Sequence, residues 1–278
     1  MTGNPSGLSV PDLPDGVYEV YAMAYARLTQ TRTGDHFMFA DLHDAPMPMD
    51  YYVWILRGSQ RTVLVDTGFC PDSAAERNRP LLFDPVEGLR QIGVVPELVK
   101  DVILTHLHYD HAGGIDRFPA ARFHVQDAEV AYATGRCMCH RIGRLVYRLE
   151  DVVTLVRNIY AERVNFVDGD ADILPGISVH LLPGHSRGMQ GVSVQTPRGR
   201  VLLASDASHF YANFERNAPF AYTVDVPSTL DTYRRMQQLV ASPDMIVPGH
   251  DPGVRARYGA RHVNGIELIP LHLPPGQS

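Results

Sequence analysis

The sequence predicts an α/β fold in which two similar halves face each other across a polar site. Five short apolar runs each end in Asp or His, which is how the strands of open α/β sheets present polar groups at their carboxyl ends. The two halves also follow one plan. A strand that ends in Asp and a later strand that ends in His occur first at Asp66 and His106, and again at Asp206 and His250.

Length and composition describe an ordinary globular chain. Its 278 residues are 45% hydrophobic and 20% charged, which allows a substantial core in one large domain or two small ones. No charge run or low-complexity linker divides the chain. We therefore expect a single domain over residues 1–278, with mobile ends at residues 1–16 and 270–278.

The charge and hydropathy of the chain limit its partners. The formal net charge of −6 gives no electrostatic reason to expect nucleic acid, because nucleic-acid binders present a basic patch. No apolar segment approaches the roughly 20 residues that span a bilayer, and residues 1–16 contain no apolar stretch of a secretory signal. We expect a cytoplasmic protein that acts on a small molecule, with no nucleic-acid or membrane partner.

The first third of the chain reads as strands joined by tight turns, followed by a helix. Apolar and aromatic residues predict strands at residues 17–29, 51–56 and 62–65, and a short turn makes the last two a hairpin. Residues 85–92 are helical in pattern, and Gly93 fits the position just past a helix end.

Beyond that helix, strand and helix patterns alternate. Strands are expected at residues 102–104 and 121–125, and residues 196–200 form a hairpin turn. Residues 228–240 have helical spacing, with Ser228 as the N-cap.

Residues 138–160 carry apolar side chains in steps of three and four. This spacing predicts an amphipathic helix of about six turns. Such a helix packs on its own domain, forms a wall of the substrate pocket or makes a subunit contact. A homodimer through residues 138–160 is therefore one expected assembly.

The chemistry is concentrated in the pattern H-x-H-x-D-H at residues 106–111, which follows a short buried strand. Imidazole and carboxylate are ligands suited to zinc and neighbouring divalent metals. His106 and His108 point to the same side, because they lie two residues apart in extended backbone. Asp110 and His111 fall where the chain turns off the strand and can face a second position nearby. The spacing favours two adjacent metals.

Three later residues complete a candidate ligand set. Similar apolar runs lead to His185 in a Pro-Gly-His sequence, to Asp206 in Ser-Asp and to His250 in a second Pro-Gly-His. Any one of these residues alone would be given a structural role. Together with the motif, they indicate a metal site.

With these motifs in this order, the chain resembles the metallo-β-lactamase superfamily. The match rests on H-x-H-x-D-H, a Gly-His after a strand, an Asp after the next strand and a Gly-His near the end, and it spans roughly residues 62–250. The resemblance implies a four-layer αβ/βα sandwich, with two facing mixed sheets and outer helices, and a dinuclear metal site between the halves. It also implies that Asp66, in Val-Asp-Thr-Gly, supports the ligands through hydrogen bonds.

The resemblance further implies two divalent metals, with zinc expected. The candidate ligands then divide into two sets and a bridging residue: His106, His108 and His185; Asp110, His111 and His250; and Asp206. Two metals about 3.5–4 Å apart share a water and lower its pKa towards neutrality, which gives a bridging hydroxide. Attack of this hydroxide on a carbonyl would hydrolyse esters, lactones, thioesters or amides, and the same site can cleave phosphodiesters.

Within the superfamily the chain looks most like the N-acyl-homoserine-lactone lactonases, the enzymes of quorum quenching. The supporting features are its size, the lack of an added domain, Ala-Gly-Gly after the motif, and Ser-Asp-Ala around Asp206. A lactone or related cyclic ester is therefore the expected substrate, with N-acyl-homoserine lactone as the leading candidate.

Two departures from the lactonase pattern bear on the substrate. Those lactonases have a Tyr three residues after the bridging Asp, which assists the substrate carbonyl. This chain has His209 there and Tyr211 two residues further on. Residues 186–190 read Ser-Arg-Gly-Met-Gln, where many relatives have Pro-Gly-His. A lactone other than N-acyl-homoserine lactone is compatible with both changes.

The catalytic candidates are Asp110, His209 and Tyr211. An imidazole at position 209 can donate a hydrogen bond to a carbonyl oxygen or pass a proton to the leaving alkoxide. The alternative for His209 is to pack against Phe210 or Phe214 at the pocket wall. In a further arrangement the catalytic hydroxyl is shifted by two positions, to Tyr211.

Other activities on the same fold stay open. A thioester hydrolase of the glyoxalase II type uses the same ligands but usually carries a C-terminal helical domain with basic residues. The different class is an iron-dependent oxidoreductase, whose diiron members carry a flavin domain that this sequence lacks. The acidic balance disfavours a nuclease, and the intact ligand set argues against a non-catalytic metal-binding module.

Overall fold

The computed structural model describes residues 7–39 and 44–276. Its strands are β1 Glu19–Leu28, β2 Met49–Arg57, β3 Thr62–Val65, β4 Asp101–Ile103, β5 Arg122–Gln126, β6 Val164–Val167, β7 Ala171–Leu174, β8 Ile177–Leu181, β9 Gln190–Thr196, β10 Gly199–Ser205, β11 Ile246–Pro248, β12 Arg261–Val263 and β13 Ile266–Pro270. Its α-helices are α1 Thr33–His36, α2 Pro71–Arg77, α3 Pro85–Gln91, α4 Tyr109–Ala112, α5 Asp127–Ala133, α6 Leu149–Tyr160, α7 Tyr211–Arg216, α8 Val226–Gln238 and α9 Gly253–Tyr258. Four short 3₁₀ turns in the described chain are η1 Pro96–Leu98, η2 Ile115–Arg117, η3 Arg136–Cys139 and η4 Pro243–Met245.

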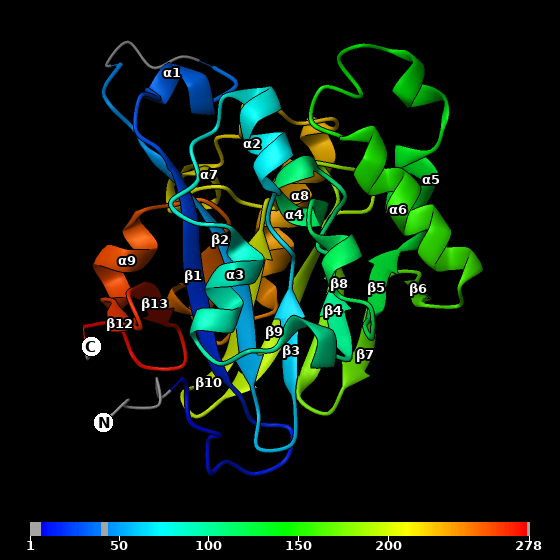
Figure 1. Cartoon of the computed structure of the whole chain (residues 1–278). Coiled ribbons are helices and arrows are strands. Elements are labelled where there is room, and N and C mark those ends of the chain that lie inside the picture. The colour runs from blue at the N-terminus through cyan, green and yellow to red at the C-terminus, as the bar shows by residue number, and fades with distance from the viewer. Residues whose placement is uncertain (1–6, 40–43, 277–278) are drawn as a thin grey trace.

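The strands form two mixed sheets (Figure 1). The first has the order β12-β13-β1-β2-β3-β4-β5-β6, and the second has the order β11-β10-β9-β8-β7. Hairpins join the antiparallel neighbours β2 and β3 in the first sheet and β9 and β10 in the second. Parallel neighbours follow in each sheet, β3 with β4 and β10 with β11. The expected ligands follow β4, β10 and β11, and His185 follows the antiparallel strand β8.

Alternating side chains of β2 show how the layers pack. Ile55 belongs to a buried cluster with Leu89 of α3. Trp54 belongs to a second cluster with Val194 of β9 and Met236 of α8. Because successive residues of a strand point to opposite faces, the first sheet has helices on one face and the second sheet on the other. The architecture is the expected sandwich of two sheets between outer helices (Figure 1).

Most predicted elements are confirmed with small shifts of their ends. The β2–β3 hairpin, the strands β4 and β5 and the helix α3 lie where the pattern predicts them. The helix expected from Ser228 is α8, but its N-cap is Asp225, whose carboxylate accepts the N–H of Ser228 at 3.1 Å. Asp is as favourable as Ser at an N-cap, so residue type alone does not show which of the two begins the helix.

The predicted six-turn helix over residues 138–160 is wrong. The chain forms the turn η3, then an irregular stretch, and only α6 is helical. The guanidinium of Arg144 donates to two carbonyl groups of η3, which closes the chain on itself before α6. The carbonyl of Val146 accepts a hydrogen bond from the N–H of Tyr109 at 2.9 Å. The apolar steps of three and four therefore run first through a loop, which lies against the 106–111 motif, and only then through α6.

The expectation of a mobile end from residue 270 fails at Leu271 and His272, which are both buried. The N–H of Leu271 donates to the carbonyl of Val20 at 2.8 Å, so the chain continues along β1. Residues 1–6 and 277–278, which belong to the expected mobile ends, lie outside the described residues. In the part of the chain that the structure describes, no helix has the length and apolar character needed to cross a membrane.

Candidate metal centre and active site

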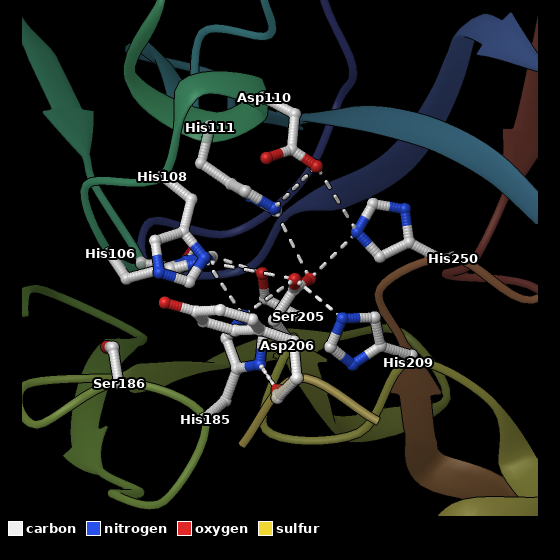
Figure 2. A network of polar contacts seen from close by, with 12 residues as sticks. His106, His108, Asp110, His111, His185, Ser186, Ser205, Asp206, His209 and His250 are labelled. Carbon is white, nitrogen blue, oxygen red and sulfur yellow. Dashed lines mark hydrogen bonds and ion pairs between the residues drawn. The ribbon is translucent and has the colours of Figure 1, made fainter. Parts of the chain in front are cut away.

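Seven buried His and Asp side chains converge at the carboxyl ends of the central strands (Figure 2). They come from segments that follow β4, β8, β10 and β11, and those after β4 include the helix α4. Two groups of side chains each offer ligand atoms that lie within 4.8 Å of one another: His106, His108, His185 and Asp206; and Asp110, His111, Asp206 and His250. Only Asp206 belongs to both groups, so it occupies the shared position between them.

Glycines before two of the histidines allow these close approaches. Gly184 has a φ of 139°, and a Cβ on it would lie 2.1 Å from the hydroxyl oxygen of Thr229. A Cβ on Gly249 would lie 2.6 Å from Oδ1 of Asp206. In each Pro-Gly-His sequence, only glycine fits at the position before the histidine, because the chain passes so close to its neighbours there.

Unsatisfied ring nitrogens show that the site fits a metal. Nε2 of His106, His108 and His111 is buried in each case and has no hydrogen-bond partner among the described residues. Nε2 of His185 lies 3.0 Å from Nδ1 of His108, and the two imidazole rings meet at an angle of 71°. Buried polar atoms are normally hydrogen-bonded, and neutral imidazole is a common metal ligand. The donor set therefore suits divalent metal ions.

The environment sets the protonation of this cluster. Burial, and then the neighbouring histidines, lower the pKa of His106 and of His108 well below the ordinary value. These two imidazoles are therefore neutral, which is the form that binds metal. Burial acts to raise the pKa of Asp206, but the surrounding histidines hold it well below its ordinary value. Asp206 is accordingly a carboxylate at neutral pH.

Backbone carbonyls fix the orientation of two of the histidines. Nδ1 of His185 lies 2.8 Å from the carbonyl oxygen of Tyr222, and Nδ1 of His250 lies 2.8 Å from that of Asp50. Since a carbonyl can only accept, each Nδ1 carries the proton. In both residues Nε2 is left to face Asp206, at 3.3 Å and 2.9 Å from its carboxylate oxygens. Such outer hydrogen bonds are typical of metal-binding histidines.

Asp66 supports the motif as expected. It is fully buried, with the left-handed φ of 64°. Its Oδ1 accepts the N–H of Thr105 at 2.7 Å, and its Oδ2 accepts the Thr105 hydroxyl at 2.8 Å. Nδ1 of His111 lies 2.7 Å from the same Oδ2. The prediction that Asp66 holds the His106 segment through hydrogen bonds is confirmed. Asp66 also orients His111.

Glu129 is a supporting residue that the sequence analysis missed. Its carboxylate is fully buried. Oε1 accepts the N–H of Leu107 and the hydroxyl of Tyr147, both at 3.0 Å. Oε2 accepts the hydroxyl of Ser186 at 2.6 Å and the N–H of Gly188 at 3.0 Å. Because Leu107 separates two candidate ligands and Ser186 follows a third, Glu129 ties together the two segments of the first group.

His209 lies within the cluster, as Figure 2 shows. Its Nε2 is 3.0 Å from Oδ2 of Asp206. The ring stacks on Phe220, with centroids 3.5 Å apart and an angle of 8° between the planes. The predicted packing partners Phe210 and Phe214 are thus replaced by Phe220. Burial lowers the pKa of His209 to about 3, so the imidazole is neutral.

Tyr211 is placed elsewhere, which corrects its selection as a catalytic candidate. It is the first residue of α7, and its backbone N–H donates to the carboxylate of Asp251 at 2.9 Å. Its ring lies under the guanidinium of Arg257, 3.5 Å from the ring centroid, and packs in the cluster between the sheets. It is not among the described residues that line the cavity at the metal cluster. Tyr211 begins α7, and its side chain packs between the sheets instead of facing the metal cluster.

A cavity of about 450 Å³ lies at this cluster. Six of the predicted site residues line it: His108, Asp110, His185, Asp206, His209 and His250. The other lining residues are Met49, Tyr51, Glu76, Arg77, Arg79, Tyr109, Leu145, Val146, Phe220 and Tyr222. The lining combines aromatic and apolar side chains with two arginines.

Comparison with known proteins gives consistent matches. The model of the family described as "Metallo-beta-lactamase superfamily" matches residues 47–250. An N-acyl homoserine lactonase from Bacillus cereus is 30% identical over 219 residues, which cover 72% of this chain and 80% of that protein. A solved quorum-quenching N-acyl homoserine lactone lactonase is 26% identical, with a TM-score of 0.71, and the match covers 87% of this chain and 95% of that one.

A second solved structure is similar to the same extent. It is a variant of the lactonase AiiA from Bacillus thuringiensis with N-decanoyl-L-homoserine bound at its active site. It is 25% identical, with a TM-score of 0.72, over 86% of this chain and 96% of that one. The chain therefore shares its sandwich fold with these solved lactonases.

Proposed function

The chain belongs to the metallo-beta-lactamase superfamily, and on this premise we propose that it is a metal-dependent hydrolase that opens lactones. The observation that carries the proposal is the pair of ligand groups joined by Asp206 at one cavity. Five imidazoles and two carboxylates make up the two groups, and such N and O donors suit zinc. The proposed cofactor is two zinc ions, which would polarise an ester carbonyl and activate water at neutral pH.

The chain's own residues would orient the reactants. Asp206 lies between the two groups, and His209 holds it by the contact of Nε2 with Oδ2 at 3.0 Å. Because the imidazole is neutral and stacked on Phe220, it presents one N–H in a fixed direction. We assign this N–H to orienting Asp206; when substrate displaces this contact, the same N–H can donate to the ester oxygen instead.

Asp110 is the proposed proton carrier of the site. Its Oδ2 lies 3.6 Å from Nε2 of His111 and 3.7 Å from Nε2 of His250, and the residue lines the cavity. A carboxylate at this place is open to substrate on one side and held by the ligand cluster on the other. It can therefore accept the proton that hydrolysis releases and pass it to solvent.

The relatives favour N-acyl homoserine lactone as substrate. The similar proteins from Bacillus cereus and Bacillus thuringiensis are lactonases for this class, and the latter holds N-decanoyl-L-homoserine. Quorum quenching is then the proposed biological role. The cytoplasmic location and the homodimer through residues 138–160 stay predictions; exposed Ile142, Leu145 and Leu149 lie in that segment.

One experiment tests the proposed reaction. Purified protein is offered a panel of lactones, linear esters, thioesters and a β-lactam, and proton release is followed with and without a chelator. Rapid, chelator-sensitive opening of lactones is expected, because each ring gives one carboxylic acid that ionises at neutral pH. Preferred hydrolysis of thioesters, or lactone opening that survives complete metal removal, would contradict the proposal.

A further inference from the structure

One end of the cavity holds a cation without an acidic partner. Arg79 lines the cavity, and among the described residues no carboxylate forms an ion pair with it. Glu76 also lines the cavity but is bound to Arg148, at 3.2 and 3.3 Å. Arg77 is held by the carbonyls of Leu145 and Tyr147. The positive charge of Arg79 is therefore available to an anionic group of a molecule that binds in the cavity.

The local structure holds Arg79 in this place. The helix α2 ends at Asn78, which adopts the left-handed conformation with a φ of 50°. The N–H of Arg79 then donates to the carbonyl of Ala74 at 2.9 Å, a contact typical of helix C-caps. The side chain is half-buried, and its Nε is buried without a hydrogen-bond partner in the described chain. The Arg79 guanidinium therefore has N–H groups that can donate to a ligand in the cavity.

Two phenols adjoin Arg79, whose guanidinium is within hydrogen-bond reach of both hydroxyl groups. Tyr51 and Tyr109 line the same cavity and are both buried. A phenolic hydroxyl can donate a hydrogen bond to an anion while it accepts one from a guanidinium. The Tyr51 ring meets that of His250 edge to face at 5.0 Å, so Tyr51 adjoins the second ligand group.

We propose that Arg79, with Tyr51 and Tyr109, binds an anionic substituent of the substrate, so that the preferred substrates are lactones that carry a carboxylate. This inference rests on the proposed lactonase function. A guanidinium pairs with carboxylate through two parallel hydrogen bonds, which a neutral amide oxygen cannot accept in the same way. The ring ester lies at the ligand groups during reaction, so the carboxylate must belong to the side chain of the lactone.

Matched substrates isolate the effect of this charge. N-malonyl-, N-succinyl- and N-glutaryl-homoserine lactones are compared with the N-propanoyl, N-butanoyl and N-pentanoyl compounds, which carry a methyl group in place of the terminal carboxylate. The zinc-loaded enzyme should favour at least one carboxylate of the series by about 10–100-fold in kcat/KM, the scale of a charge-assisted hydrogen bond. The preference should fall as ionic strength rises.

Variants then assign the preference to Arg79. Arg79→Gln should bring the ratio towards one, mainly through KM, whereas Arg79→Lys should keep part of it. The matched control is Arg234→Gln, which removes an equally positive but exposed side chain, paired with Asp231 on the outer surface of α8. Circular dichroism and metal content confirm that each variant is folded and loaded.

The outcomes separate this inference from the proposed function. If neither series is hydrolysed by the metal-loaded enzyme, the lactonase function itself fails. If both series are hydrolysed equally well, or if Arg79→Gln leaves the ratio unchanged, the anion site is overturned. If Arg79→Gln alters only inhibition by the opened products, Arg79 binds the carboxylate that hydrolysis creates, which also overturns the substrate assignment.

Discussion

His111 donates a hydrogen bond from Nδ1 to Oδ2 of Asp66 at 2.7 Å. This contact fixes the tautomer of His111 and leaves its Nε2 free, 3.3 Å from Oδ1 of Asp206. The same carboxylate binds Thr105 through two hydrogen bonds. A residue that follows β3 thereby orients ligands that follow β4, and Asp66 acts on both groups without belonging to either.

We expect Asp66→Asn to weaken metal binding by about 10–100-fold, the usual scale for the outer partners of metal ligands. The amide places an N–H where the carboxylate accepted two hydrogen bonds, so His111 loses its fixed tautomer. Competition with a chelating dye measures the affinity. Asp231→Asn, at an exposed position on α8, is the matched control and should bind metal like the parent. Equal affinities for both variants would refute the role of Asp66.

Glu129→Gln should affect mainly the first ligand group. The amide cannot accept from all four donors that the carboxylate serves, and each buried donor left unpaired costs about 1–3 kcal/mol. We expect a lower free energy of unfolding and the preferential loss of one metal on dialysis, because Leu107 and Ser186 adjoin ligands of that group alone. Thermal unfolding and elemental analysis measure both effects. Exposed Glu150 supplies the control Glu150→Gln; retention of both metals by Glu129→Gln would count against the assignment.

His209→Phe should lower kcat by about 10²-fold with both metals retained, the scale of general acid–base assistance. Phenylalanine keeps the stacking on Phe220 but removes the N–H that meets Asp206. Tyr211→Phe should leave kcat nearly unchanged, since the hydroxyl lies outside the cavity. Steady-state kinetics on one lactone compares the two. A loss of kcat in Tyr211→Phe alone would show that Tyr211, and not His209, acts in catalysis.

The sequence was sufficient for the ligands because their signal is local. His106, His108, Asp110 and His111 share one short motif, and the later ligands follow apolar runs that read as strands. Strand ends of one sheet meet at a common edge, so the cluster could be expected before any contact was known. The sandwich itself was expected from a resemblance, since the pairing of distant strands such as β1 and β13 leaves no local pattern.

Supporting residues were harder to predict because their contacts join distant parts of the chain. Glu129 meets Ser186 across 57 residues, and Phe220 reaches His209 from the segment before α8. Arg79 follows a short helix and has no motif of its own. The opposite error occurred in residues 138–160, where helical spacing was real but Arg144 bonds back to η3 and the chain forms a loop. The spacing of apolar residues shows which side chains can be buried, but tertiary contacts determine whether the segment forms a helix.

Metal stoichiometry coupled to lactone hydrolysis tests the central claim most directly. The protein is loaded with zinc, freed of excess metal, and examined by elemental analysis and by proton release on an N-acyl homoserine lactone. We predict about two ions per chain in the active protein, and in Asp206→Ala the loss of hydrolysis together with most of one ion, because Asp206 alone belongs to both ligand groups. Full activity with a single ion, or an Asp206→Ala variant that keeps both ions and still opens the lactone, would contradict the account.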